Sequence, residues 1–140
     1  MKNQINFHDL PKVNTSEAQL TVWLIDLAQH YQVEINRLVY NFIDKNQMLV
    51  MNQNFLNHDT HTDILTFSYS ENEINTEVYI SVDALKENAL KFSQTTEKEL
   101  FRLLSHGFLH AIGFNDKTEN EKQIMTEQED LCINLFHVKH

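Results

Sequence analysis

Residues Thr96–Asp116, TEKELFRLLSHGFLHAIGFND, decide the fold because they encode a buried helix and the turn that follows it. Thr96 with Glu99 has the pattern of a capping box, so we expect the helix to begin near Glu97. Apolar residues then recur at helical spacing, which predicts a largely buried helix; they are Leu100, Phe101, Leu103, Leu104 and Phe108. Gly113 should end the helix, since glycine adopts the left-handed conformation without steric cost.

Two histidines on this helix predict a metal site. His106 and His110 are four residues apart and therefore face the same way. Asp116 follows the turn, where its carboxylate can be the third ligand. Asp116 could instead be an N-terminal residue of the next helix. Three protein ligands with an open fourth position are typical of catalytic zinc, so the three residues predict one Zn²⁺, through which the histidines act in catalysis. We expect Gly107 to leave open space between the histidines for a substrate or backbone.

The residue after the first histidine separates this site from the common zinc peptidases. In HExxH enzymes that residue is a glutamate acting as general base, whereas here it is Gly107. A metal could still activate water and polarise a phosphoryl or carbonyl oxygen. Candidate proton carriers elsewhere in the chain, each of which has a purely structural or solvent-facing alternative, are Asp63, Glu77, His58 and His61.

Composition limits the class of protein. The chain has 140 residues and is 41% hydrophobic, which predicts one domain over residues 1–140. Neither a signal peptide nor a stretch long enough to cross a membrane is visible. The single cysteine, Cys132, lies among apolar residues and fits a buried position in a reducing compartment, so we expect a cytoplasmic protein. The net charge of −9 argues against broad nucleic-acid binding, so an RNA would need a local patch, the charge of a metal or a larger assembly.

The rest of the chain alternates between strand and helix patterns. We expect strands around Ile5 and Phe7 and over Val33–Ile43, Asp63–Tyr69 and Glu77–Val82. Between the last two, SENEINT (70–76) reads as a polar turn. Helices are expected after caps at Ser16 (with Gln19), Asn46, Asp83 and Thr118 (with Glu121), the last helix reaching about Phe136. The predicted fold is α+β, a small mixed β-sheet of about four strands covered by helices, with a zincin-like metal helix.

Four segments together resemble one protein family. HGFLHAIGFND resembles the HGxLHxxGxDH signature of the YbeY family of rRNA maturation factors and metal-dependent endoribonucleases. Residues Met51–Phe67, MNQNFLNHDTHTDILTF, resemble the family segment LNxxYRxxxxPTDVLSF without a gap. Thr76–Ser81, TEVYIS, resembles GDIxIS, and Met125–Glu129 resembles the acidic stretch of the family's last helix.

The resemblance implies a fold, an activity and partners. It implies an α+β sheet with a three-ligand zinc site and a cytoplasmic, single-strand-specific endoribonuclease that processes rRNA, including the 3′ end of 16S rRNA. Its partners would be ribosomal RNA and the small ribosomal subunit or its assembly proteins, with no membrane partner.

Three positions depart from the family pattern. The third histidine is Asp116 here; a carboxylate oxygen binds zinc at a similar distance, but its charge makes bound water less acidic and favours a harder metal. The family's arginine is Leu56, which cannot pair with phosphate, and its aspartate in GDI is Glu77. The missing arginine and the acidic charge leave open a non-catalytic ribosome-assembly factor with a structural metal. A zincin-like metallopeptidase is the weakest alternative.

Overall fold

A four-stranded mixed sheet forms the centre of the computed structural model, which describes residues 4–56 and 63–139. The strands are β1 (Ile5–His8), β2 (Ile35–Ile43), β3 (Ile64–Ser68) and β4 (Ile74–Ser81). Their order in the sheet is β1-β2-β4-β3, with β1, β2 and β4 parallel and β3 antiparallel to β4. The α+β prediction with about four strands is confirmed.

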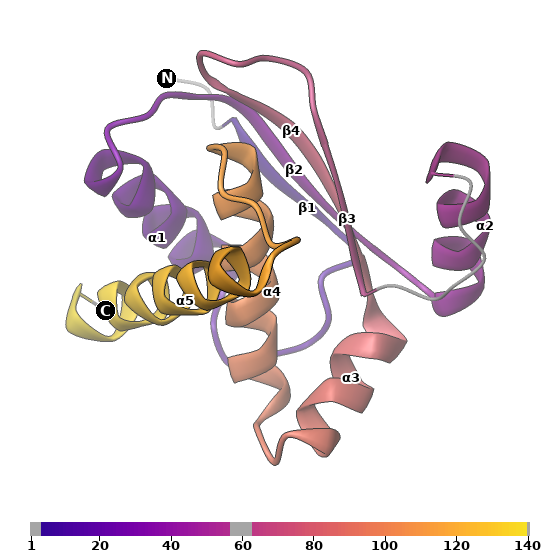
Figure 1. The fold of residues 1–140 in the computed structure, drawn as a ribbon. Coiled ribbons are helices and arrows are strands. Elements are labelled where there is room, and N and C mark those ends of the chain that lie inside the picture. Colours follow the sequence, from indigo (N-terminus) through magenta and orange to yellow (C-terminus); the bar gives the residue numbers. More distant parts are fainter. Residues whose placement is uncertain (1–3, 57–62, 140) are drawn as a thin grey trace.

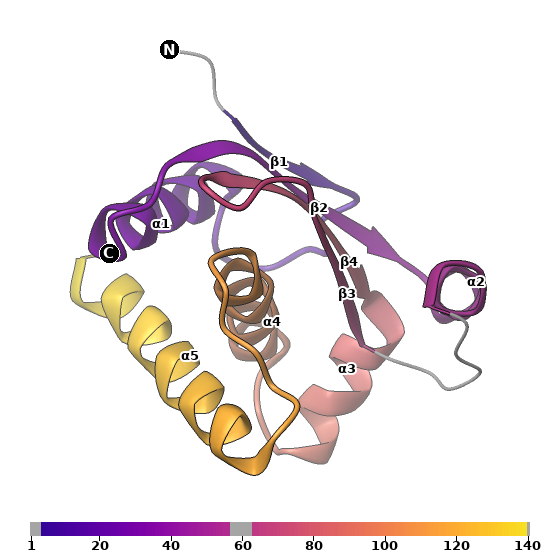
Figure 2. The ribbon, with the colours of Figure 1, turned by 45° about the horizontal axis from the view of Figure 1, so that its top comes forward.

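Helices cover the two faces of the sheet unequally. They are α1 (Glu17–His30), α2 (Lys45–Leu56), α3 (Val82–Lys91), α4 (Thr96–Ala111) and α5 (Glu119–Lys139). Helices α1, α4 and α5 lie on one side of the sheet, which we call the inner face, and α2 lies beyond its other side (Figures 1 and 2). The helix that carries both histidines, α4, is therefore enclosed by the sheet and by other helices.

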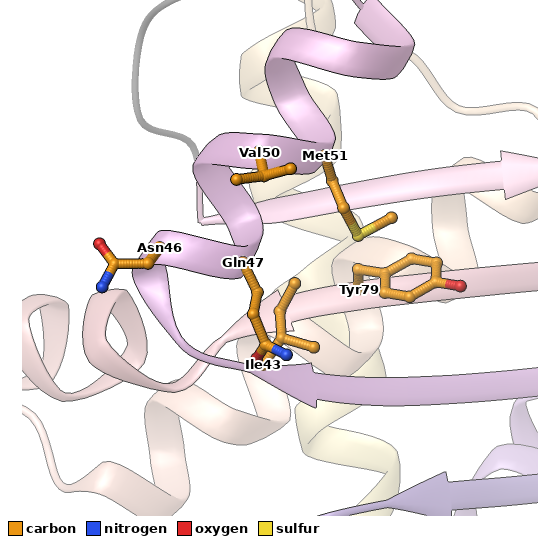
Figure 3. Close-up of a pocket in the computed structure, with 6 residues that line it drawn as sticks. All are labelled: Ile43, Asn46, Gln47, Val50, Met51 and Tyr79. Carbon is orange, nitrogen blue, oxygen red and sulfur yellow. The ribbon is translucent and has the colours of Figure 1, made fainter.

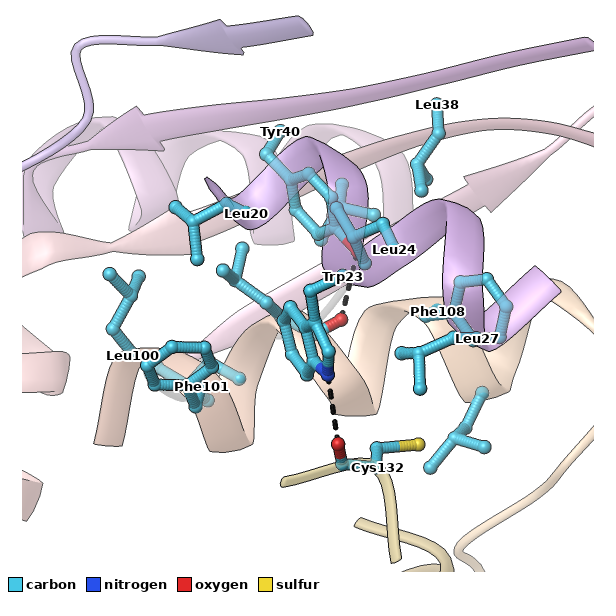
Figure 4. Close-up of a cluster of buried hydrophobic side chains, with 14 of the residues drawn as sticks. Leu20, Trp23, Leu24, Leu27, Leu38, Tyr40, Leu100, Phe101, Phe108 and Cys132 are labelled. Carbon is cyan, nitrogen blue, oxygen red and sulfur yellow. Dashed lines mark hydrogen bonds between the residues drawn. The ribbon is translucent and has the colours of Figure 1, made fainter. Parts of the chain in front are cut away.

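The hydrophobic core fills the space between the inner face and the helices (Figure 4). Trp23 of α1 is fully buried, and its indole Nε1 donates a hydrogen bond to the carbonyl oxygen of Cys132 in α5, 2.8 Å away. Tyr40 of β2 is also fully buried and donates its hydroxyl to the carbonyl oxygen of Leu104 in α4, at 2.8 Å. The two bonds satisfy the polar ends of large aromatic side chains, so both residues stabilise the core without an unpaired donor. Cys132 is buried as predicted.

The helix caps were predicted with mixed success. Ser16 caps α1 and forms the expected capping box with Gln19. Thr118 accepts from the backbone N–H of Glu121 at 3.1 Å, also as expected at the start of α5. The predicted caps of the other helices were wrong by one or two residues, since the capping side chains are Asp44 for α2, Ser81 for α3 and Thr95 for α4. In each case a neighbouring polar residue is better placed, and its side chain accepts a hydrogen bond from a backbone N–H in the first turn of the helix.

Strand β4 begins three residues earlier than the sequence suggests. Ile74 and Thr76, assigned to a polar turn, are buried and continue the inward alternation of Val78 and Ile80. Pairing with β2 extends the ladder to Ile74, which pairs with Ile35 across a register shift between Ile35 and Arg37. Long-range pairing thus overrides a locally polar segment.

Gly107 does not leave open space, contrary to prediction. A Cβ atom at this position would lie 2.9 Å from Cγ1 and 3.1 Å from Cγ2 of Val78 in β4. Gly107 instead allows α4 to pack closely against the inner face of the sheet. This close approach sets the position of the two histidines relative to β3 and β4.

Candidate metal centre

The three predicted ligands converge at the end of α4. The Nε2 atoms of His106 and His110 are 3.0 Å apart. Asp116 Oδ2 lies 3.1 Å from His106 Nε2 and 3.4 Å from His110 Nε2. All three side chains are partly buried, and their ligand atoms lie within 4.8 Å of one another, the spacing of a group that could hold a metal ion.

The turn after α4 brings Asp116 back to the histidines. Gly113 has a φ of +108°, in the region that favours glycine. Its N–H donates to the carbonyl oxygen of His110 at 3.1 Å, and the N–H of Phe114 donates to that of Leu109 at 3.0 Å. These two bonds are the Schellman pattern that ends a helix with a glycine. The predicted helix stop is confirmed, and it reverses the chain so that Asp116 reaches the metal group.

Both imidazole rings are oriented by a hydrogen bond at Nδ1. His110 Nδ1 lies 2.9 Å from the carbonyl oxygen of Phe114, and His106 Nδ1 lies 2.6 Å from Glu129 Oε2. A carbonyl and a carboxylate only accept, so each Nδ1 carries a proton, and in a neutral ring each Nε2 then has a lone pair for a metal ion. Two nitrogen lone pairs and a carboxylate oxygen then face one another, an arrangement that a cation stabilises. The donor set and its outer hydrogen bonds fit zinc.

The surroundings of His106 are acidic. Burial lowers the pKa of His106, but the hydrogen bond and charge of Glu129, with the charges of Asp116 and Asp63, outweigh it and raise that pKa above its ordinary value. Burial also raises the pKa of Glu99, which lies on the same side of α4 as His106. A region that favours positive charge is the electrostatic environment a divalent cation needs.

Glu129 is the site residue that sequence reasoning missed. It entered the family resemblance only as part of an acidic stretch, without a role. A signal was present, because Glu129 lies on the buried face of α5 between Met125 and Cys132. A charged residue at helical spacing among buried apolar residues must have a partner.

Asp63 lies near enough to His106 and Glu99 for its charge to act on both, but it was not predicted to be a ligand. It directly precedes β3, where its Oδ2 accepts a hydrogen bond from Asn88 Nδ2 at 3.3 Å. Its backbone oxygen accepts from the N–H of Ser81 at 3.0 Å, which attaches it to the end of β4. Its charge contributes to the raised pKa of both His106 and Glu99.

Glu77 lies on the opposite face of the sheet from the histidines. In β4 its side chain alternates with that of Val78, which points to the inner face and Gly107. Glu77 is held there by Arg37, 2.8 Å away, and accepts from the Tyr69 hydroxyl at 3.1 Å. The arginine bond lowers the Glu77 pKa. Strand alternation therefore prevents Glu77 from reaching the metal group.

The remaining predicted residues fall in or beside a segment outside the described residues. His58 and His61 lie between residues 57 and 62, which the structure does not describe. Leu56 is the last residue of α2, but its side chain is likewise not among those described.

A pocket of about 490 Å³ lies away from the metal group (Figure 3). Its lining residues come from β2, α2 and β4: Ile43, Asn46, Gln47, Val50, Met51 and Tyr79. Tyr79 alternates with Val78 and Ile80, so this pocket is on the α2 side of the sheet. Among the described residues, its lining has no imidazole, carboxylate or basic side chain, and thus none of the usual metal ligands.

Comparison with known proteins identifies the family. The family model described as Endoribonuclease YbeY matches residues 2–137. The chain is 40% identical to endoribonuclease YbeY of Cytophaga hutchinsonii over 120 residues, 84% of each chain. It is 35% identical to endoribonuclease YbeY of Christiangramia forsetii over 140 residues, 99% of this chain and 98% of that one.

The fold has a relative among solved structures. The solution structure of TM1509 from Thermotoga maritima superposes with a TM-score of 0.67, covering 96% of this chain and 90% of that one at 23% identity. Within the described part of the chain, every helix is too short or too polar to cross a membrane. The family model and the curated relatives show that the chain belongs to the endoribonuclease YbeY family.

Proposed function

We propose that this chain is a metal-dependent, single-strand-specific endoribonuclease that processes rRNA, including the 3′ end of 16S rRNA. The observation that carries the proposal is the convergence of His106, His110 and Asp116, with both Nδ1 atoms bonded to acceptors. Membership in a family whose curated relatives are named endoribonucleases supports the reaction class. The proposal includes one Zn²⁺ per chain, a cytoplasmic location, and ribosomal RNA with the small subunit or its assembly proteins as partners.

The site residues would have separate roles in metal binding and proton transfer. His106, His110 and Asp116 would hold the ion. Bound zinc supplies Lewis acidity toward a phosphodiester oxygen and makes water a stronger acid. Asp63 is the proposed proton carrier, because its charge acts on His106 and its carboxylate is held by a hydrogen bond from Asn88.

The charge of the protein affects how RNA would bind. At a net charge of −9, long-range electrostatics oppose the approach of a polyanion. Leu56 replaces the family's arginine and supplies no phosphate contact. We therefore expect the affinity for RNA to depend more strongly on the metal than in relatives that have the arginine.

The peptidase alternative is disfavoured by packing. HExxH peptidases need a glutamate at the position of Gly107. A Cβ there would already be 2.9 Å from Val78, so this helix has no room for that side chain.

The test combines RNA cleavage with metal analysis. Purified protein should contain about one zinc per chain and cleave single-stranded RNA, with activity lost on chelation. His110→Ala should reduce cleavage on the order of 100-fold or more, the scale of losing a principal electrostatic group. His30→Ala is the matched control, because His30 is exposed at the end of α1 and should retain full activity. Unchanged cleavage by His110→Ala or by chelated protein would contradict the proposal.

A second candidate is a non-catalytic assembly factor with a structural metal, favoured by Leu56 and the acidic charge. It predicts that a stable His106→Ala protein restores normal rRNA precursor processing in cells that lack the wild-type protein. The proposed nuclease predicts that this variant does not restore processing at matched expression.

A further inference from the structure

A buried carboxylate lies behind the metal centre. Glu129 of α5 is only 5% exposed. Its Oε2 is 2.6 Å from His106 Nδ1, and its Oε1 accepts from Arg102 Nη1 at 2.8 Å. Both carboxylate oxygens therefore have charged or polar partners, and the group is fixed between α4 and α5.

Arg102 compensates the burial of this charge. It lies one turn before His106 on α4, so the two residues face α5 together. Arg102 Nε is also 3.9 Å from Glu99 Oε1, and Arg102 Nη2 is 3.8 Å from Asp130 Oδ1. A buried carboxylate without such partners would be strongly destabilising, and here the arginine and the imidazole N–H hold it in one orientation.

The two histidines differ in what orients them. His110 is held by a backbone carbonyl in the turn after α4. His106 is held by a full negative charge from another helix. A carboxylate behind a ligating imidazole raises the basicity of the ring and fixes its tautomer, so removing one side chain should affect His106 selectively.

We propose that Glu129, held by Arg102, is a positioning residue for the metal centre. It fixes His106 with its Nδ1–H toward α5 and its Nε2 toward the ion, and its negative charge strengthens metal binding. This inference rests on the proposed metal site and adds a residue that does not touch the ion.

The direct test is the zinc affinity of Glu129→Gln, measured by competition with a chromophoric chelator. The variant keeps the size of the side chain and loses its charge, so we expect zinc to bind 10- to 100-fold more weakly, the range for outer hydrogen-bond partners. Asp130→Asn is the matched control: it removes a charge from the next residue, but Asp130 is largely exposed and is near Arg102 rather than His106. Its affinity should change by less than about threefold, well below that range. Equal affinities of wild type and a folded Glu129→Gln would overturn the proposal.

A second measurement needs no variant and so does not depend on the folding of Glu129→Gln. In ¹⁵N NMR spectra of zinc-loaded wild-type protein, His106 should carry its proton on Nδ1 and bind through Nε2. Binding through Nδ1, or an Nδ1 without a proton, would overturn the proposal. If the wild type binds no zinc at all, the metal site itself fails, whereas equal binding by Glu129→Gln removes only the role of Glu129.

Discussion

At the scale of single residues, the two glycines of the chain meet different physical requirements. Gly113 is needed for its backbone, since its φ of +108° lets the chain reverse after α4. Gly107 is needed for its missing side chain, since α4 approaches β4 at Val78. Both act on the metal group indirectly, one by returning Asp116 and the other by seating the histidine helix on the sheet.

Replacing Gly107 tests the close packing. Gly107→Ala adds a Cβ 2.9 Å from a methyl group of Val78. Val78 is fully buried in a paired strand, so its side chain cannot move away freely. Overpacking costs about 1–3 kcal/mol, while alanine gains about 1 kcal/mol of helix propensity. We expect a net loss of up to about 2 kcal/mol in the free energy of unfolding, measured with urea. In a Val78→Ala background the same substitution should become neutral or stabilising, and an equal cost in both backgrounds would contradict the packing explanation.

The pH dependence of stability should report the burial of Cys132. Burial raises the pKa of its thiol from 9.0 to about 11. A group whose folded pKa is raised stabilises the fold below the unfolded pKa, and this contribution is lost as the pH rises through the folded pKa. The stability advantage of wild type over Cys132→Ala should therefore narrow between about pH 9 and about pH 11. Urea unfolding at several pH values measures it, and a constant difference would contradict the assignment.

At the scale of elements, α4 is the helix that links sheet, core and site. Its apolar side chains are buried, whereas His106, His110 and Arg102 lie on the side that faces α5 and the following turn. Helix α5 runs beside α4 (Figure 2). Its residue Glu129 contacts His106 of α4. The geometry of the metal group therefore depends on the packing of α5, which in turn contacts α1 through Trp23.

Trp23→Phe tests the contact between α1 and α5. The variant loses the buried hydrogen bond to the Cys132 carbonyl and leaves unfilled volume in the core. We expect a loss of about 2–4 kcal/mol in the free energy of unfolding from the two effects together. Val22→Ala, at a neighbouring exposed position of the same helix, is the control and should stay within about 0.5 kcal/mol. A Trp23→Phe protein as stable as the control would show that α1 and α5 do not depend on this contact.

At the scale of the whole molecule, the metal group joins parts of the chain that are distant in sequence. Asp116 and the two histidines surround the position for a metal ion. Glu129 contacts His106 from the following helix, α5. A ligand that binds only this folded arrangement stabilises the entire fold by mass action.

Zinc removal should thus lower the stability of the whole protein. At a free zinc concentration about a thousandfold above Kd, bound metal contributes about 4 kcal/mol. For a domain of this size that corresponds to roughly 10 °C in Tm. Thermal unfolding with zinc and with a chelator measures the effect, and His110→Ala should show a much smaller difference. A Tm unaffected by chelation of the wild type would contradict metal binding at this site.

The sequence by itself determined the strands and helices to within a few residues, and it indicated the three residues that converge at the end of α4. Those features are local, because helical spacing, a glycine stop and a short return depend on neighbours in the chain. Only the tertiary structure decided which side of the sheet each residue faces, so it separated Glu77 from the histidines and brought in Glu129. It also showed that the space beside Gly107 is filled by the Val78 side chain rather than open. Pairing register and helix packing join residues far apart in sequence, and no local pattern specifies those contacts.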